Sequence, residues 1–339
     1  ASLDGRQPGT GESLRPLLPG LEACSDFVAA FLCFVHERQC IWKRRWENPD
    51  GEITNNAIMS KHWFTNMYRE LDRGTTFFRS NNLNTTLRGK TVDPTSSRSN
   101  RRILRRVLFK SISYRLMNKL ETFQEFGKLP DIGDWEEFRD FLECKMKNGE
   151  RVFTAAHQNM GLKNYLNTLS HISEKLDDYT NRVIEAADER SLKKCYAALK
   201  SIPNVGPFFA WQILCDLLEF NLLGRSTENQ WTVLGPGAKK GLRRIFHSVD
   251  SGFDELQLTR LLTRLCASTG TGSGFAALDL AFPTFLGREL SLKNVEHALC
   301  EFEKYCQLAT GGTGRLRVFA EHTSRAHLDQ VFKCSKCFA

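Results

Sequence analysis

Residues 199–214, LKSIPNVGPFFAWQIL, predict a helix, a tight turn and a second helix. Pro203 and Gly206 bracket the turn, and Gly206 can adopt a positive φ while leaving no side chain between the backbone and a ligand. The first N–H groups of the second helix then point outward, and the helix dipole adds partial positive charge, so this end suits phosphate. The same residues also fit a plain corner whose apolar side chains fill the core. The stretch therefore indicates either a phosphate contact or a structural corner.

The composition of the whole chain is that of a globular protein with one large or two ordinary domains: 339 residues, 41% hydrophobic and 25% charged. Lys and Arg number 47 against 39 Asp and Glu, and this net charge of +8 permits a polyanionic partner without requiring one. The 11 cysteines follow no signal-peptide pattern, so we expect reduced thiols in an intracellular protein, nuclear in a eukaryote and otherwise cytoplasmic. The longest apolar run, residues 27–35, is too short to span a membrane.

Three parts of the chain differ in composition. Residues 1–22 predict a disordered lead-in, residues 23–308 show helical periodicity, and residues 309–339 form a tail with a Cys-x-x-Cys motif. Long stretches of alternating polar and apolar residues are missing, so the predicted fold class is all-α. Within the helical part we expect a polar loop at 79–100 and helices at 24–46, 54–71, 101–126, from 134, 165–176, 181–187, 192–200, from 239, 252–266 and 291–307.

Four arginines at the start of one predicted helix form a candidate nucleic-acid contact: Arg101, Arg102, Arg105 and Arg106. They make two i,i+4 pairs of like charge, and no acidic residue lies between Asp93 and Glu121. Each such pair costs about 0.2–0.5 kcal/mol, and a polyanion relieves the repulsion while releasing counterions. The alternative is a solvated face that acidic residues elsewhere in the fold balance. We favour the nucleic-acid contact.

A second cluster combines arginines with a carboxylate. Arg38, Arg69 and Arg73 are fork-shaped donors suited to phosphate oxygens, and Arg69 and Arg73 share one face of the predicted helix. Asp72 lies beside them in the sequence. An internal ion-pair lattice between two helices produces the same pattern, and spacing alone favours that lattice.

Metal-ligand patterns in the sequence are incomplete. His297 and Glu301 lie four residues apart on a predicted helix without a third ligand, so a structural pair is the better interpretation. Cys334 and Cys337 form half of a zinc knuckle without a second half, and we expect no zinc there. The chain also lacks a GxxxxGK[ST] match, so it is not itself a P-loop kinase.

Six blocks in order resemble the α-glutamyl/putrescinyl-thymine pyrophosphorylases and the related helical domain of 5-hydroxymethyluracil DNA kinases. The resemblance covers residues 26–308, and its hairpin at 192–220 is similar to the helix-hairpin-helix motif that grips DNA backbone in base-excision glycosylases. The blocks are ER…KRR at 37–45, FTN…YRELDR at 64–73, NKLETF at 118–123, the hairpin at 202–216, GPGAKKGL at 235–242 and VEHALCE at 295–301.

This resemblance implies an all-α fold of the helix-hairpin-helix DNA glycosylase type and a late step of thymine hypermodification in DNA. A 5-hydroxymethyluracil base is first phosphorylated or pyrophosphorylated, and an amine or amino acid then displaces that leaving group at the exocyclic carbon. The implied partners are DNA, the amine or amino-acid co-substrate and a separate 5-hydroxymethyluracil DNA kinase, with no membrane. The hairpin offers a place for a monovalent cation, and we expect no other cofactor and no metal site.

The family resemblance turns the clusters above into a predicted site. Asp72 or Glu296 takes a proton from the attacking amine, with Arg69 as the third catalytic residue. The residues expected to bind the leaving phosphate are Arg38, Arg73, Lys239 and Lys240, the last two in a Gly-Pro-Gly-Ala-Lys-Lys turn that enters a helix. The residues expected to contact DNA are Asn204, Val205, Gly206 and Phe208 of the hairpin, together with the four arginines.

Glycosylase chemistry itself is not expected. A lyase-type glycosylase needs a Lys where this hairpin has Phe208, and glycosylases need an Asp after the hairpin, where residues 233–237 read VLGPG. These departures favour a fold that keeps its grip on DNA and performs other chemistry. Two alternatives stay open, a glycosylase-like enzyme on modified pyrimidines with a displaced acid, and a non-catalytic module that binds modified DNA.

Overall fold

The computed structural model describes residues 21, 24, 26–154, 160–246, 254–270 and 272–312. Over these residues the chain is helical, and the described part contains no β-strand, only an isolated bridge between Phe285 and Arg288. The all-α prediction is therefore confirmed. Most of the predicted lead-in, and the tail with Cys334 and Cys337, lie outside the described residues.

The helices follow one another through the chain with short connections. They are α1 (Phe27–Glu47), α2 (Ala57–Lys61), η1 (Arg69–Leu71), α3 (Arg73–Asn84), α4 (Arg101–Met117), α5 (Leu120–Phe126), η2 (Ile132–Asp134), α6 (Trp135–Lys147), α7 (Gly161–Asp188), α8 (Leu192–Lys200), α9 (Pro207–Glu219), α10 (Pro236–Ile245), α11 (Glu255–Leu265), α12 (Gly274–Ala277) and α13 (Leu292–Ala309).

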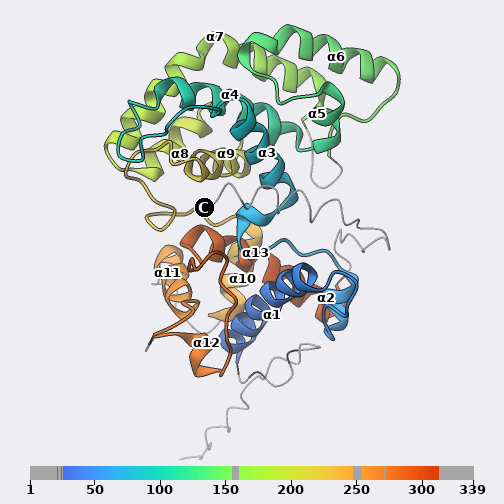
Figure 1. The fold of residues 1–339 in the computed structure, drawn as a ribbon, viewed down its shortest axis with the longest axis vertical. Coiled ribbons are helices and arrows are strands. Elements are labelled where there is room, and N and C mark those ends of the chain that lie inside the picture. Colours follow the sequence, from blue (N-terminus) through green and yellow to red (C-terminus); the bar gives the residue numbers. More distant parts are fainter. Residues whose placement is uncertain are drawn as a thin grey trace, which may run out of the picture.

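Two lobes make up the described part, each with its own hydrophobic core (Figure 1). The upper lobe consists of α3–α9 and is built on α4, which is buried continuously from Val107 to Met117. The lower lobe consists of α1, α2 and α10–α13. The chain starts in the lower lobe, enters the upper lobe after η1 and returns before α10, so segments distant in sequence meet between the lobes (Figure 1).

Close packing of α10 on α13 explains the glycines of the GPGAKKGL block. A Cβ atom on Gly237 would lie 2.5 Å from Sγ of Cys300, and one on Gly241 would collide with the carbonyl oxygen of Leu299. Glycine at both positions, one helical turn apart, lets the two helix backbones approach. The block therefore has a packing role that its sequence pattern did not indicate.

The helix predicted at 54–71 does not form. Asn56 caps the short α2, residues 62–68 run in non-helical conformation, and only η1 and α3 resume helical structure. Side chains hold the non-helical segment, since Arg38 donates to the carbonyl of Phe64 at 2.9 Å and Glu301 accepts the N–H of Thr65 at 2.8 Å. Helix α3 then covers the start of the region predicted as a loop at 79–100.

Candidate functional site

The hairpin that decided the sequence interpretation is present as α8, a turn at 201–206 and α9. The prediction that Gly206 adopts a positive φ is wrong, because Gly206 has φ −72° and forms the N-cap of α9. Asn204 takes the left-handed conformation instead, with φ 62°, and its amide donates to Oγ1 of Thr168 at 2.9 Å. Asn tolerates this conformation because its short polar side chain bonds locally.

The tip of the hairpin is open around Gly206. A Cβ atom on Gly206 would meet no other atom within 4 Å, and the ring of Phe208 is 54% exposed. Val205, in contrast, is buried in the upper core, so only its backbone can face a ligand. This geometry keeps the predicted DNA contact at Asn204, Gly206 and Phe208 sterically accessible.

We expect Gly206→Arg to weaken binding to all DNA sequences alike, because the new side chain blocks close approach of a phosphate backbone to the turn. Gly133→Arg is the matched control, since Gly133 also has open space around it and the variant gains the same charge in η2. The measurement is the dissociation constant for two unrelated duplexes at one salt concentration. Equal affinities of the Gly206→Arg variant and the parent would make the hairpin a core corner.

The arginines of α4 have acidic partners across the upper lobe. Arg101 and Arg105 both pair with Asp177 of α7, at 2.6 and 3.2 Å, and Arg106 pairs with Asp131 at 2.5 Å. These pairs are the acidic balance that the alternative interpretation anticipated. Surface pairs of this kind contribute little stability and exchange readily with solvent, so the DNA contact of α4 stays a prediction.

The salt dependence of DNA binding tests that contact. Arg102 is exposed, and replacing all four α4 arginines by Gln should flatten the slope of log K against log salt by up to about 0.9 per lost phosphate contact. Isothermal binding curves at a series of salt concentrations measure the slope, with the unfolding midpoint recorded on the same samples. An unchanged slope would identify α4 as a solvated face.

Charged residues from both lobes meet at the N-terminal half of α13. Arg69 is buried and donates through its guanidinium to Gln212 of α9, while Asn294 accepts its backbone N–H at 3.2 Å. Glu296 accepts from Trp211 Nε1 at 3.1 Å and from the N–H of Gly235 at 3.4 Å. Two predicted catalytic residues, Arg69 and Glu296, thus lie in one interlobe network.

Burial raises the pKa of the Glu296 carboxyl, and the positive charges of His297 and Arg69 counteract that rise. Its place at the start of α10 is the one that the sequence pattern had suggested for a phosphate. A carboxylate beside the first N–H groups of a helix interacts favourably with the dipole. Glu296 therefore occupies, in part, the predicted phosphate cradle.

Asp72 lies in a half-exposed group next to this network. Its Oδ1 accepts the backbone N–H of Asn66 at 2.9 Å, and its Oδ2 lies 3.5 Å from Nε2 of His297. The same Nε2 lies 2.6 Å from Oγ1 of Thr65. The side chains of His297 and Asp72 are 18% and 20% exposed, whereas their neighbours Arg69 and Glu296 are buried.

Arg38 lies beneath this group. It donates to Oδ1 of Asn66 at 2.8 Å, so the Asn66 side chain and backbone connect Arg38 to Asp72. Burial lowers the pKa of the Arg38 guanidinium to about 10, and the carboxylates of Asp72 and Glu301 oppose the shift. Its Nη1 is buried and has no hydrogen-bond partner among the residues that the structure describes.

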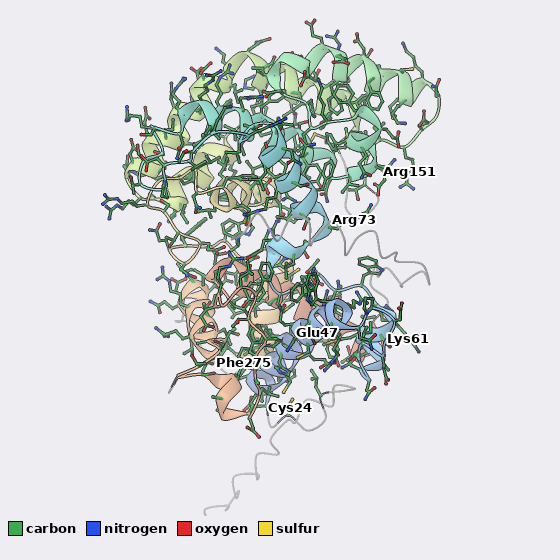
Figure 2. The ribbon with its side chains drawn as sticks, in the orientation of Figure 1. Cys24, Glu47, Lys61, Arg73, Arg151 and Phe275 are labelled. Atoms are coloured by element: carbon green, nitrogen blue, oxygen red, sulfur yellow. The ribbon has the colours of Figure 1, made fainter. Side chains whose placement is uncertain are left out.

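Three predicted phosphate-binding residues do not join the site. Arg73 pairs with Glu121 at 2.8 Å on the surface, beside the upper lobe in Figure 2, and does not share a helix face with Arg69. Lys239 turns to Glu255 of α11 at 2.7 Å, and Lys240 is exposed. Their positions depend on helix boundaries and on partners that spacing does not reveal.

A buried ion cluster between the lobes was missed by the sequence interpretation. Lys293 of α13 lies 3.2 Å from Glu219 of α9 and 2.5 Å from Glu228, and Arg79 of α3 lies 2.8 Å from Glu219. Glu70 accepts a hydrogen bond from Arg288 at 2.5 Å, and burial raises the pKa of Glu70. No local pattern announces this cluster, because its members come from five separate segments.

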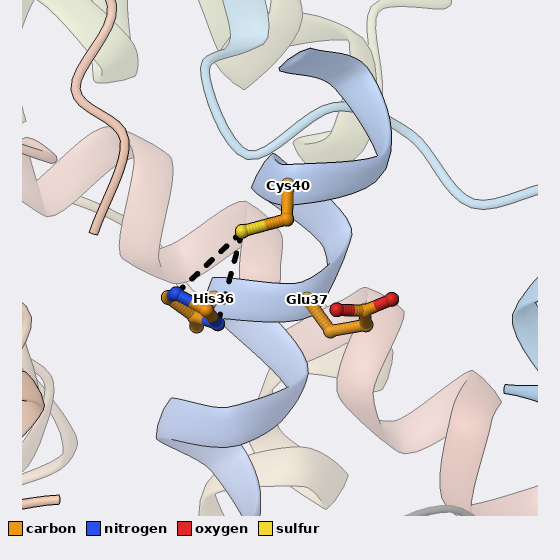
Figure 3. A group of neighbouring side chains, drawn as sticks. All are labelled: His36, Glu37 and Cys40. Atoms are coloured by element: carbon orange, nitrogen blue, oxygen red, sulfur yellow. Dashed lines mark hydrogen bonds between the residues drawn. The ribbon is translucent and has the colours of Figure 1, made fainter. Parts of the chain in front are cut away.

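One group of possible metal ligands lies on α1 (Figure 3). Sγ of Cys40 lies 3.5 Å from Nε2 of His36, one turn away. The Glu37 carboxylate points to another side of the helix in Figure 3 and accepts hydrogen bonds from Arg44 and Thr54, at 2.8 and 2.6 Å. The predicted pair of His297 and Glu301 also has no mutual contact, since Glu301 binds Lys304 and the N–H of Thr65.

Comparison with known proteins identifies the class. The family model "5-hmdU DNA kinase, helical domain" matches residues 25–313, and the chain belongs to this family. The chain is similar to a 5-hmdU DNA kinase of Bacillus phage SP10, with 26% identity over 291 residues, which cover 79% of this chain and 43% of that relative. The chain thus spans less than half of that relative's length. No solved structure matches the chain, and none of the described helices combines the length and apolarity needed to cross a membrane.

Proposed function

We propose that this chain is the helical part of a DNA-modifying transferase that acts at 5-hydroxymethyluracil. The support is its membership of the family and its similarity to the phage 5-hmdU DNA kinase. The chain has no P-loop match, so a separate kinase supplies the phosphate on the hydroxymethyl group. The reaction proposed for this chain is the next one, displacement of (pyro)phosphate by an amine or amino acid.

One observation carries this proposal most strongly. Residues from three family blocks, far apart in the sequence, converge on one place: Arg38 on α1, Asp72 before α3, and Glu296 with His297 on α13. Buried charges surround a half-exposed acid–base pair there, which is the arrangement typical of an active site. An internal lattice would pair every charge and leave none of them open to solvent.

In the proposed reaction, the amine nitrogen attacks the exocyclic methylene carbon and the bond from that carbon to the phosphate oxygen breaks. The electron pair of this bond leaves with the phosphate, and Arg38 and Arg69 stabilise the charge that develops there. The attacking nitrogen must then lose one proton. The target base is presented outside the duplex stack, because groups held in a protein cannot reach it otherwise.

A second function, a non-catalytic module for modified DNA, is favoured by the hairpin alone. The open turn at Gly206 and the exposed Phe208 lie on the upper lobe and need no chemistry from α13. Backbone contacts of this kind bind DNA without reading or changing a base.

Nucleoside mass spectrometry distinguishes the candidates. DNA carrying phosphorylated or pyrophosphorylated 5-hydroxymethyluracil is incubated with the protein and candidate amines, then digested. An aminated nucleoside that Arg38→Gln abolishes supports the transferase, and Lys240→Gln is the control at an exposed cation outside the site. Release of a free base would identify a glycosylase, and binding without any new nucleoside would identify the module.

A further inference from the structure

We propose that His297 accepts the proton of the attacking nucleophile, with Thr65 and Asp72 as its partners before and after the transfer; this rests on the function proposed above. The geometry is the observation behind it. A single ring nitrogen, Nε2, lies 2.6 Å from the Thr65 hydroxyl oxygen and 3.5 Å from a carboxylate oxygen of Asp72. Sequence spacing had suggested only a metal pair for this histidine.

The two neighbours of Nε2 suit two different protonation states. A neutral ring with an unprotonated Nε2 accepts the hydrogen of the Thr65 hydroxyl, whereas a protonated Nε2 donates to the Asp72 carboxylate. His297 therefore has a suitable partner both without and with the additional proton. A purely structural histidine needs only one of them.

The backbone around Thr65 is fixed, which keeps these distances short. Glu301 accepts the Thr65 N–H at 2.8 Å, and Lys304 holds Glu301 at 2.7 Å. On the other side, the Asn66 N–H holds Asp72 at 2.9 Å. Side chains that are locked by such neighbours give the defined geometry that proton transfer requires.

The charges around His297 come from every element packed against it. On α13 they are Glu296, Glu301 and the Lys304 that pairs with Glu301; before α3 there is Asp72; on η1 Arg69; and on α1 Arg38. Acids and bases both belong to this environment, so the imidazolium is not isolated. The half-exposed ring leaves a side on which a nucleophile can approach.

The proton step follows from the displacement. When the amine nitrogen bonds to the methylene carbon and the phosphate leaves with the electron pair, the nitrogen carries a surplus proton. Nε2 takes this proton, releases its bond to Thr65 and pairs with Asp72. Solvent then removes the proton from the half-exposed ring, and His297 returns to its neutral form.

Proton-resolved NMR of the full chain tests the arrangement without activity. Asp72→Asn should lower the pH at which the His297 ring titrates, because the cation loses its partner, and Thr65→Val should raise it, because the neutral form loses its donor. His171, which contacts Tyr179 on α7, is the internal control and should not respond. Unchanged midpoints of His297 in both variants would overturn the proposal.

Turnover provides the second test. His297→Gln should lower single-turnover formation of the aminated nucleoside about 10²-fold with DNA affinity retained, and added imidazole should restore part of the rate. His171→Gln should have no effect. If the parent protein aminates DNA and His297→Gln does so equally fast, the inference fails while the proposed function stands. If the parent makes no such product, the proposed function fails, and the opposed NMR shifts still decide the proton arrangement.

Discussion

The variant Lys293→Met is expected to lose about 3–5 kcal/mol of the free energy of unfolding, because removing one partner leaves the others as uncompensated buried charges. The side chain of Lys293 is 3% exposed and lies between Glu219 and Glu228, at the place where the lobes meet. Burial opposes the charge on Lys293, yet the carboxylates raise its pKa overall. Methionine fills similar volume, so the loss reports the charge and not a cavity.

Denaturant unfolding at two pH values measures this effect. Despite burial, Lys293 and Arg79 lower the pKa of Glu219, so its stabilising contribution is present above the ordinary glutamate range and is lost as pH falls through the lowered value. The penalty of Lys293→Met should therefore be larger near about pH 7 than near about pH 4, where the carboxylates can protonate. Lys194→Met, at an exposed pair with Glu189, is the control. Equal stability of Lys293→Met and the parent would show that water reaches the cluster.

The fold class and the family were accessible from the sequence because both depend on local patterns. Helical periodicity with missing strand alternation predicted the all-α fold, and ordered motifs predicted the family. The boundaries near residues 54–71 failed for the opposite reason. Apolar spacing there favours a helix, but Arg38 and Glu301 hold residues 64 and 65 from other helices, and these tertiary contacts prevail over local propensity.

The candidate site was predicted in part. Arg38, Asp72, Arg69 and Glu296 were named from charge patterns within family blocks, and the structure brings them to neighbouring positions around α13. The contact between Thr65 and His297 joins residues 232 positions apart, and no spacing rule reports such a pair. Arg73 failed because a change of helix after η1 turned it toward Glu121.

The variant Asp72→Asn should lower turnover by about 10² or more and leave the unfolding midpoint nearly unchanged. The Asn66 N–H can bond to the Asn oxygen as it does to Oδ1, so the local structure keeps its main contact. What disappears is the negative charge 3.5 Å from Nε2 of His297, which the proposed protonated state requires. A structural lattice makes the opposite forecast, in which stability falls because a buried arginine loses a counter-charge and activity persists in the folded fraction.

Both quantities must come from one preparation to separate these forecasts. Thermal unfolding reports the stability, and single-turnover formation of the aminated nucleoside reports the chemistry. Asp188→Asn is the control, since Asp188 pairs with Arg98 on the far side of the upper core and should affect neither quantity strongly. A large fall in the unfolding midpoint with full activity per folded molecule would remove Asp72 from the active site. Loss of turnover at parental stability would place its charge in the reaction, because the exchanged atoms differ in charge and hardly in shape.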